Sequence, residues 1–251
     1  MIERYHEYQE LAAGYLEHFL PAVAEDINQP VEHFKGKSSI EVAASLGLDM
    51  FIAASNYSGE ELSKANSKGL TPVHIAAAKG MVNTVQALLT KGAKPDAVNS
   101  KGQAPIQSAL FMPMFHPDDL KSKKIAIAAL LYAAHKSTVL HQDLDGDTPL
   151  HKAAAQGFDE FITTVVTEQA EVVELSNKLG HYPIHTAILN GQIDCTNALF
   201  NSAPAEISVA NQPDNKGRVA LHYAARYGEI DMRRGCLAQT KALDIVDKKG
   251  N

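Results

Sequence analysis

Four histidines recur along the chain within similar short phrases, and imidazole is the side chain most suited to metal binding or proton transfer near neutral pH. They are His74, His151, His185 and His222. A metal site needs several ligands around one ion. These histidines come one to a repeated unit, so in a stack of helices they lie roughly 10 Å or more apart. We therefore expect each to have a structural role and predict no metal ion and no cofactor.

The segment Asp143–Thr148, with the sequence DLDGDT, has the acid spacing of two known kinds of loop. It resembles the D-x-D-G-T nucleophile loop of haloacid-dehalogenase phosphatases, but Asp147 intrudes before the threonine. Read as a calcium loop, it has Thr148 where glycine is required and Ala154 where a bidentate glutamate is required. We expect neither phosphatase chemistry nor calcium binding here.

Other signs of catalysis are weak. Cys195 and Cys236 lie among apolar residues of predicted helices, whereas a nucleophilic thiol needs a neighbouring base, so we expect both in the core. Gly36-Lys37-Ser38 ends like a phosphate-binding loop, but Val31 stands where the leading glycine must be. No G-x-G-x-x-G, H-E-x-x-H or G-x-S-x-G motif occurs. The sequence predicts that the chain is not an enzyme, and two cysteines without a disulfide framework favour a cytoplasmic location.

The histidines belong to a ten-residue phrase that recurs along the chain. It reads TPLHKAAAQG at 148–157 and TPVHIAAAKG at 71–80. Shorter or weaker copies begin at residues 38, 104, 182 and 219. Two positions before each copy stands a glycine, and these glycines are 33 to 44 residues apart: Gly36, Gly69, Gly102, Gly146, Gly180 and Gly217, with Gly250 opening a seventh copy.

A period of about 33 residues with a T-P-L-H-x-A phrase is typical of ankyrin repeats. From about residue 34 to its end the chain resembles the ankyrin-repeat family. The resemblance implies an all-α solenoid of about six helix-turn-helix repeats with an N-terminal helical cap. The expected units are the cap at 1–33 and repeats over 34–251, divided at about 34–66, 67–99, 100–143 with an insertion, 144–177, 178–214 and 215–247, followed by the start of a seventh.

Each repeat should run as a turn, a first helix, a second helix and a loop. Proline in the first helical turn costs no hydrogen bond. Gly80, Gly157, Gly191 and Gly228 are expected to end the first helices in left-handed geometry. The third repeat has 11 extra residues, which we place between its helices at about 111–123. This insertion either folds back onto adjacent repeats or forms a loop that binds a partner.

The charge distribution argues against nucleic-acid binding. Residues 1–32 hold seven acids and one base, which accounts for the formal net charge of −6, so the repeats are neutral overall without a basic stripe. Residues 1 to about 20 read as an amphipathic helix, either a cap or a docking helix for a partner. No apolar run approaches the ~18–20 residues that span a bilayer, and no signal peptide is visible. We predict no membrane association.

The resemblance implies that another protein binds the concave surface, at positions flanking the turn glycine and near the end of the first helix. Carried onto this chain, these are Lys68, Leu70, Lys79, Lys101, Gln103, Asp145, Asp147, Gln156, His181, Lys216, Arg218, Arg226 and Tyr227; the insertion adds Phe111, Met114 and Phe115. Arginine and tyrosine dominate interface energetics, so Arg226 and Tyr227 are a predicted hot spot. We expect the last repeats to bind an acidic or mixed-charge segment.

The chain stops at Asp247–Asn251, in the first turn of a seventh repeat. We therefore expect it to be part of a longer chain. An alternative function is the recognition module of a longer enzyme, or of a secreted bacterial effector acting in the host cytosol, whose catalytic domain lies beyond residue 251. A third alternative is self-association through the acidic N-terminal helix or the insertion, although a monomer is expected.

Overall fold

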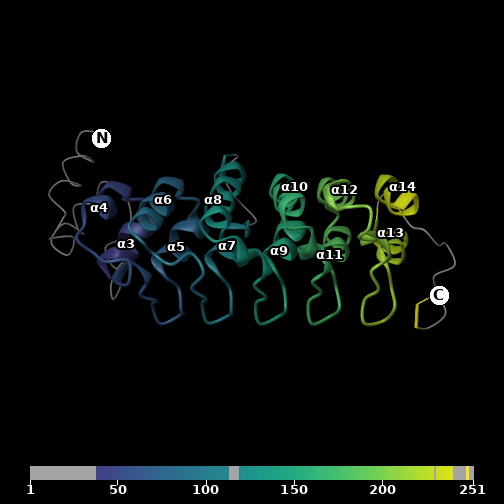
Figure 1. The fold of residues 1–251 in the computed structure, drawn as a ribbon, viewed down its shortest axis with the longest axis horizontal. Coiled ribbons are helices and arrows are strands. Elements are labelled where there is room, and N and C mark those ends of the chain that lie inside the picture. Colours follow the sequence, from purple (N-terminus) through teal and green to yellow (C-terminus); the bar gives the residue numbers. More distant parts are fainter. Residues whose placement is uncertain (1–37, 113–118, 229, 240–246, 249–251) are drawn as a thin grey trace.

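The computed structural model describes residues 38–112, 119–228, 230–239 and 247–248, which form one row of helix pairs (Figure 1). These residues contain α-helices and short 3₁₀ turns and no strand, so the predicted all-α class is confirmed. The predicted N-terminal cap, and the glycines Gly36 and Gly250, lie outside the described residues. The α-helices are α3 (Ser39–Leu46), α4 (Asp49–Ala54), α5 (Pro72–Lys79), α6 (Val82–Thr90), α7 (Pro105–Ala109), α8 (Leu120–Ala134), α9 (Pro149–Gln156), α10 (Asp159–Glu168), α11 (Pro183–Leu189), α12 (Ile193–Ser202), α13 (Ala220–Tyr227) and α14 (Ile230–Gln239).

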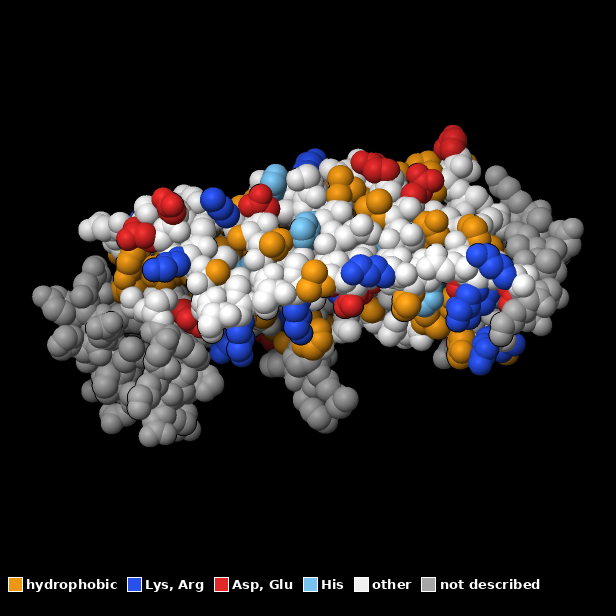
Figure 2. Space-filling view, turned by 90° about the horizontal axis from the view of Figure 1, so that it is seen from below, with side chains coloured by type: hydrophobic (Ala, Val, Ile, Leu, Met, Phe, Trp, Pro, Cys, Tyr) orange, Lys and Arg blue, Asp and Glu red, His pale blue; other side chains and the backbone are white. Residues whose placement is uncertain are grey.

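The helices form two parallel rows. The first helices of the repeats, from α3 to α13, pack on one another in sequence, and the second helices, from α4 to α14, form the other row. The turns that precede the first helices all project to the same side (Figure 1). Figure 2 looks at the molecule from the side to which these turns project. The solenoid therefore offers a long surface to which every repeat contributes the same positions.

The first helices begin in the same way because the recurring phrase carries its own capping chemistry. Proline occupies the first turn of α5, α7, α9 and α11. The side chain three residues into each helix then bonds back to the cap: His151 Nδ1 accepts the Thr148 N–H at 3.2 Å. Gln107 Oε1 does the same for the Ala104 N–H at 2.9 Å. The N–H of each cap residue, which would otherwise lack a partner, is thereby satisfied.

The first helices end as predicted in two repeats and differently in others. Gly80 and Gly157 cap α5 and α9 with φ of 76° and 82°. Gly191 has a φ of 67° but follows the actual cap, Asn190. The prediction for Gly228 is wrong: its φ is −80° and ψ 148°, because its N–H closes the last turn on Ala224 and the chain then leaves extended.

The core is a continuous strip between the two rows. Paired alanines such as Ala76-Ala77 and Ala153-Ala154 are completely buried, which lets the first helices of neighbouring repeats approach closely. Leucine, isoleucine, valine and phenylalanine side chains from the second helices fill the space between rows. Cys195 and Cys236 are buried in this strip, as predicted.

The insertion is shorter than the sequence indicated, because α8 begins at Leu120 and includes residues 121–123. The apolar face of α8 starts there: Leu120 contacts Gly80, and Ile127 and Leu131 continue the face into the core. Lys124 occupies a fully buried position on this face, where its Nζ donates to the Ser108 carbonyl at 3.3 Å. Burial lowers the pKa of Lys124 to about 8. The predicted contacts Met114 and Phe115 lie outside the described residues.

Candidate partner-binding surface

The turns are held in one shape by the Asn or Asp that opens each of them. The Asn66 Oδ1 accepts the N–H groups of Lys68 and Leu70 at 2.9 and 3.1 Å. The same pair of bonds forms at Asn99, Asp143, Asn177 and Asp214. The following glycine has a positive φ, and a Cβ at Gly180 would lie 2.5 Å from the Asn215 nitrogen. Only glycine lets one turn stack this closely on the next.

Adjacent turns are joined by hydrogen bonds. Backbone N–H groups of Ser100, Leu144, Lys178 and Lys248 donate to the carbonyls of Lys68, Lys101, Asp145 and Lys216 at 2.9 to 3.2 Å. Between the fifth and sixth repeats, the Asn215 side-chain amide donates to the Lys178 carbonyl instead, at 3.2 Å. We call the two residues before each turn glycine the turn tip. The turn tips are therefore joined into one hydrogen-bonded row.

Two of the recurring histidines join neighbouring repeats in the predicted manner. The Nε2 of His74 bonds the Gln103 carbonyl at 2.9 Å, and that of His151 bonds the His181 carbonyl at 2.8 Å. Because Nδ1 of each accepts a backbone N–H, the ring proton must be on Nε2. The prediction fails for His185, whose buried Nε2 has no hydrogen-bond partner among the residues that the structure describes. Instead, the ring of Tyr223 packs against the His185 ring, with 4.9 Å between the two ring centroids.

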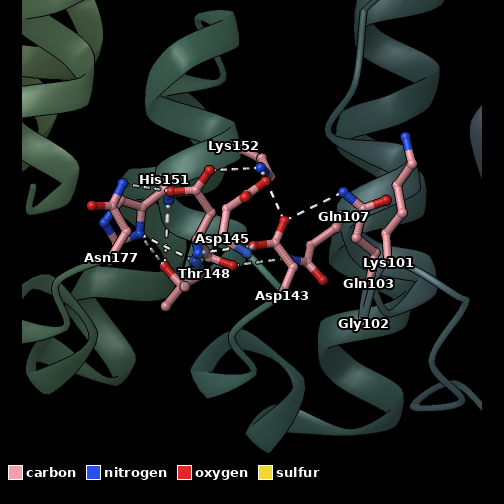
Figure 3. Close-up of polar contacts among 12 residues, drawn as sticks. Lys101, Gly102, Gln103, Gln107, Asp143, Asp145, Thr148, His151, Lys152 and Asn177 are labelled. Carbon is pink, nitrogen blue, oxygen red and sulfur yellow. Dashed lines mark hydrogen bonds and ion pairs between the residues drawn. The ribbon is translucent and has the colours of Figure 1, made fainter. Parts of the chain in front are cut away.

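Asp143 is a buried acid whose charge is balanced by Lys152 (Figure 3). Its side chain is 2% exposed, and the Lys152 Nζ lies 3.0 Å from Asp143 and 2.7 Å from Asp147. Gln103 Nε2 also donates to Asp143, at 3.3 Å. Burial acts to raise the pKa of Asp143, but the bonds from Lys152 and its other donors hold that pKa below its usual value. This cluster ties the third repeat to the fourth.

Asp214 is balanced by a different set of side chains in the sixth repeat. Its side chain is 1% exposed, and Oδ2 accepts from the Arg218 guanidinium at 2.7 Å and from the Tyr223 hydroxyl at 2.6 Å. The Tyr223 hydroxyl also lies 3.0 Å from Nε2 of His181 in the fifth repeat. Burial opposes ionisation of Asp214, yet the bonds from Tyr223 and Arg218 hold its pKa well below the usual range.

The balancing residues follow a rule within the chain that the sequence reasoning missed. Where the turn opens with aspartate, the residue nine positions later is Lys152 or Tyr223, which bonds that aspartate. Where it opens with asparagine, the same position holds a shorter or apolar side chain: Ile75, Ser108 or Thr186. This signal is present in the sequence. When the repeats are aligned, the residue that opens the turn and the residue nine positions later vary together.

A hollow of about 560 Å³ brings together predicted contacts from the second, third and fourth repeats. The apolar part of this hollow includes the Phe111 side chain, which is 61% exposed. Lys68 and Lys101 stand at its turn side, both exposed, and no ion pair of either is found in the described part of the chain. No Asp or Glu is among its described lining residues. The predicted contacts that line it are Lys68, Leu70, Lys101, Gln103, Phe111 and Gln156.

A smaller hollow of about 260 Å³ lies on the sixth repeat. Arg226 and Tyr227 both line it, and the Arg226 guanidinium stacks over the Tyr227 ring at 5.1 Å. Both side chains are exposed, Tyr227 by 52%. The two residues predicted as a hot spot are therefore accessible and mutually ordered.

Some other predicted contacts are held by bonds within the protein. Asp147 bonds Lys152 and the Asn177 amide, Arg218 bonds Asp214, and His181 bonds Tyr223. Asp145 and Lys216 are exposed at turn tips, and Lys79 is exposed at the end of α5. All of them stay predicted contacts, but the bonded ones also support the stacking of repeats.

The described residues include no group of three or more His, Cys, Asp or Glu side chains placed to hold a metal ion. No helix in the ranges that the structure describes has both the length and the apolar character to cross a membrane.

Both cysteines should react slowly with a thiol reagent while the protein is folded. Burial raises the pKa of the Cys195 thiol to about 12 and that of Cys236 to about 11, so almost no thiolate is present at neutral pH. Ellman's reagent should therefore label two thiols quickly in urea and neither quickly in buffer. Rapid labelling of native Cys195 would contradict the burial described above.

Comparison with known protein families gives consistent matches. A family model described as "Ankyrin repeats (3 copies)" matches residues 120–211 and 169–247, together more than half of the chain. A second model, "Ankyrin repeat", matches residues 68–100. The fold resembles the crystal structure of the ankyrin repeat domain of Bcl-3, described as a unique member of the IkappaB protein family, with a TM-score of 0.69 and 20% sequence identity. That match covers 86% of this chain and 92% of the other.

Among curated proteins, the chain is similar to segments of three. It is 30% identical over 105 residues to the nuclear factor NF-kappa-B p105 subunit of Gallus gallus, covering 41% of this chain and 10% of that protein. It is 31% identical over 113 residues to the ankyrin repeat protein FPV223 of fowlpox virus (strain NVSL), covering 45% and 74%. It is 35% identical over 98 residues to alpha-latrotoxin-Lhe1a of Latrodectus hesperus, covering 38% and 6%. The match thus spans only a small part of two of these relatives.

Proposed function

Because this chain belongs to the ankyrin-repeat family, we propose that its turn tips and first helices hold a partner protein and that the described part acts by binding. The observation that carries the proposal is the hollow of about 560 Å³, in which residues from three successive repeats meet. Exposed aromatic side chains such as Phe111 are enriched in protein-binding sites, and the exposed lysines beside it can attract an acidic partner.

The surface is also preorganised, which favours binding. The row of hydrogen-bonded turns and the buried clusters at Asp143 and Asp214 fix the positions of the surrounding side chains. A rigid surface loses little conformational entropy when a partner binds. The proposal therefore predicts a partner that adapts to this surface.

Replacing Arg226 and Tyr227 together with alanine should weaken partner capture without lowering the melting temperature. Both side chains are exposed, and their stacked arrangement presents a guanidinium and a phenol to one partner group. A loss of about tenfold in affinity or more is expected for a hot-spot pair. The measurement is capture of partners from a lysate of the source cell, followed by titration of the identified partner.

Leu237 offers a matched control, because it is also exposed but lies on α14, away from the turn side. A Leu237→Ala variant should capture the partner as the parent does. Equal capture by the Arg226→Ala/Tyr227→Ala variant and the parent would end the hot-spot proposal.

An alternative is that the chain is the recognition module of a longer protein. Support comes from the relatives, since the matched region is 10% of the chicken protein and 6% of the spider toxin. Reading the gene beyond Asn251 tests this, because catalytic motifs there would favour the alternative. A bacterial effector gains no support from the relatives named above, which come from a bird, a virus and a spider. A cytoplasmic location and a monomeric state remain proposals.

A further inference from the structure

We propose that the partner segment is an extended acidic strand that crosses the turn tips in steps of three residues, with apolar side chains at its centre. This inference rests on the proposed function and names the chemistry of the partner. It follows from four features of the turn tips: their charge, their rigidity, their spacing and their central leucines.

The turn tips are basic although the repeats as a whole are neutral. Exposed lysines occupy tips at both ends of the row and the tip of the fifth repeat, and the one exposed acid among the tips is Asp145. Basic side chains recur along the length of this face (Figure 2). The tip lysines are Lys68, Lys101, Lys178, Lys216 and Lys248. The sequence reasoning predicted no basic stripe because it counted charges along the chain and not by position within the repeat.

The balancing acids are elsewhere. Among the described residues, the exposed acids other than Asp145 and Asp119 lie on second helices and on the loops that follow them, including Glu160, Asp194, Asp231, Glu60, Glu171, Glu174 and Glu206. Of the other described acids of the turns, Asp143 and Asp214 are buried and bonded to internal cations, Asp147 is partly buried and paired with Lys152, and Asp247 is partly buried. The field at the tips is therefore positive and would attract an acidic segment.

The tips are held at a fixed spacing. Each is bonded to the next through a backbone or side-chain hydrogen bond. Neighbouring repeats are one helix-packing distance apart, about 10 Å, and an extended chain rises about 3.3 Å per residue. One step along the row therefore corresponds to three residues of an extended partner.

The centre of the row carries two exposed leucines, beside Asp145 and Lys178. Leu144 and Leu179 are 61% and 66% exposed at the tips of the fourth and fifth repeats. A partner in register would place acids at positions 1 and 4, apolar residues at 7 and 10, and acids at 13 and 16. Single-stranded nucleic acid fits less well, because Asp145 would repel a phosphate and no described tip carries an aromatic side chain for base stacking.

The test uses fluorescent peptides of about 16 residues, which span five steps of three residues, and the full chain. The register peptide should bind with an affinity that falls as salt is added. A peptide of the same composition with its acids grouped together should bind several-fold more weakly, because it can reach fewer tips. Equal binding of the two peptides, or tighter binding of a single-stranded DNA of similar length, would overturn the inference.

A charge swap makes the test specific to one tip. Lys101→Glu should weaken the register peptide about fivefold at low salt, since an attraction becomes a repulsion. A peptide with lysine at position 4 should recover binding to that variant. Lys94 is a matched control, because it is exposed, lies outside the turns and has no side-chain partner in the described residues. Lys94→Glu should change affinity less than twofold.

The result separates this inference from the proposed function. If the register peptide does not bind while Arg226→Ala/Tyr227→Ala still abolishes partner capture, the acidic-strand proposal is wrong and the proposed partner binding stands. If the peptide binds and the swap behaves as described, the acidic strand is supported whatever the hot-spot variant does.

Discussion

Replacing Lys152 with threonine should destabilise the protein by about 3 kcal/mol, the size expected when one member of a buried ion pair is removed. The variant would leave Asp143, whose side chain is 2% exposed, without a cation. The Gln103 amide would be its main remaining side-chain donor. Asp147 loses the same cation but keeps the Asn177 amide.

The double variant Asp143→Asn/Lys152→Thr should recover most of this loss. It recreates the pair found in the fifth repeat, where Asn177 and Thr186 hold the same two positions without charge. The Asn oxygen can still accept the N–H groups that order the turn, as Asn177 does. Urea unfolding gives the free energies, and coupling between two residues in contact should appear as non-additivity.

Lys101→Thr is the control, because Lys101 is an exposed lysine without an ion pair in the described residues, and its effect should be within about 0.5 kcal/mol. Additive losses from the single and double changes at Asp143 and Lys152 would show that the two residues do not compensate each other.

Acidification from about pH 6.5 to pH 4.5 should destabilise the stack through its buried histidines. Burial is the main cause that lowers the pKa of His74, His151, His181 and His185, and it lowers that of His185 to about 3. Protonation also requires Nδ1 of His185 to give up the Tyr182 N–H that it accepts at 3.1 Å. The charged form therefore suits the unfolded chain better than the folded one.

The direction follows from proton counting. Each histidine has a folded pKa below the ordinary 6.5, so the unfolded state binds more protons below that pH. Its contribution to stability is complete above about pH 6.5 and declines as the pH falls. For His185 alone the loss is about 2 to 3 kcal/mol at about pH 4.5. The lowered pKa values of Asp143 and Asp214 affect stability mainly below this pH range, and Glu61 and Glu168, whose pKa values are also lowered, are exposed and contribute little.

His185→Gln should flatten the pH dependence. Glutamine is the natural occupant of this position in the third repeat, where Gln107 Oε1 accepts the cap N–H. The variant keeps a cap acceptor and cannot titrate. Urea midpoints measured between pH 7.5 and 4.5 for parent and variant give the difference. Parallel curves would show that His185 does not bind protons differently in the two states.

Much of the fold could be predicted from the sequence because the signals are local. Glycines at a regular period, an Asn or Asp three residues earlier, and proline at the helix start each specify geometry within a few residues. The structural role of His74 and His151 followed from their place in the same phrase. Gly228 does not have the predicted left-handed geometry, because the local pattern does not determine how the chain continues after α13.

The start of α8 and the surface charge were decided by contacts between repeats. Residues 121–123 look like a loop in isolation. In the structure, Leu120 packs over Gly80 of the preceding repeat, and α8 begins at Leu120, before the predicted end of the insertion at residue 123. The count of 22 acids and 22 bases after residue 32 predicted a neutral surface. Stacking placed lysines at the tips and buried two of the acids beside Lys152, Arg218 and Tyr223.

The sequence by itself determined the repeat, its turn chemistry and its helical class, because these depend on residues close together in the chain. The tertiary structure alone decided which charges are paired and which face solvent. That depends on the register in which one repeat stacks on the next, where side chains about 30 to 40 positions apart come into contact. The candidate surface is a product of this stacking, and its chemistry could be read only once neighbouring repeats were in place.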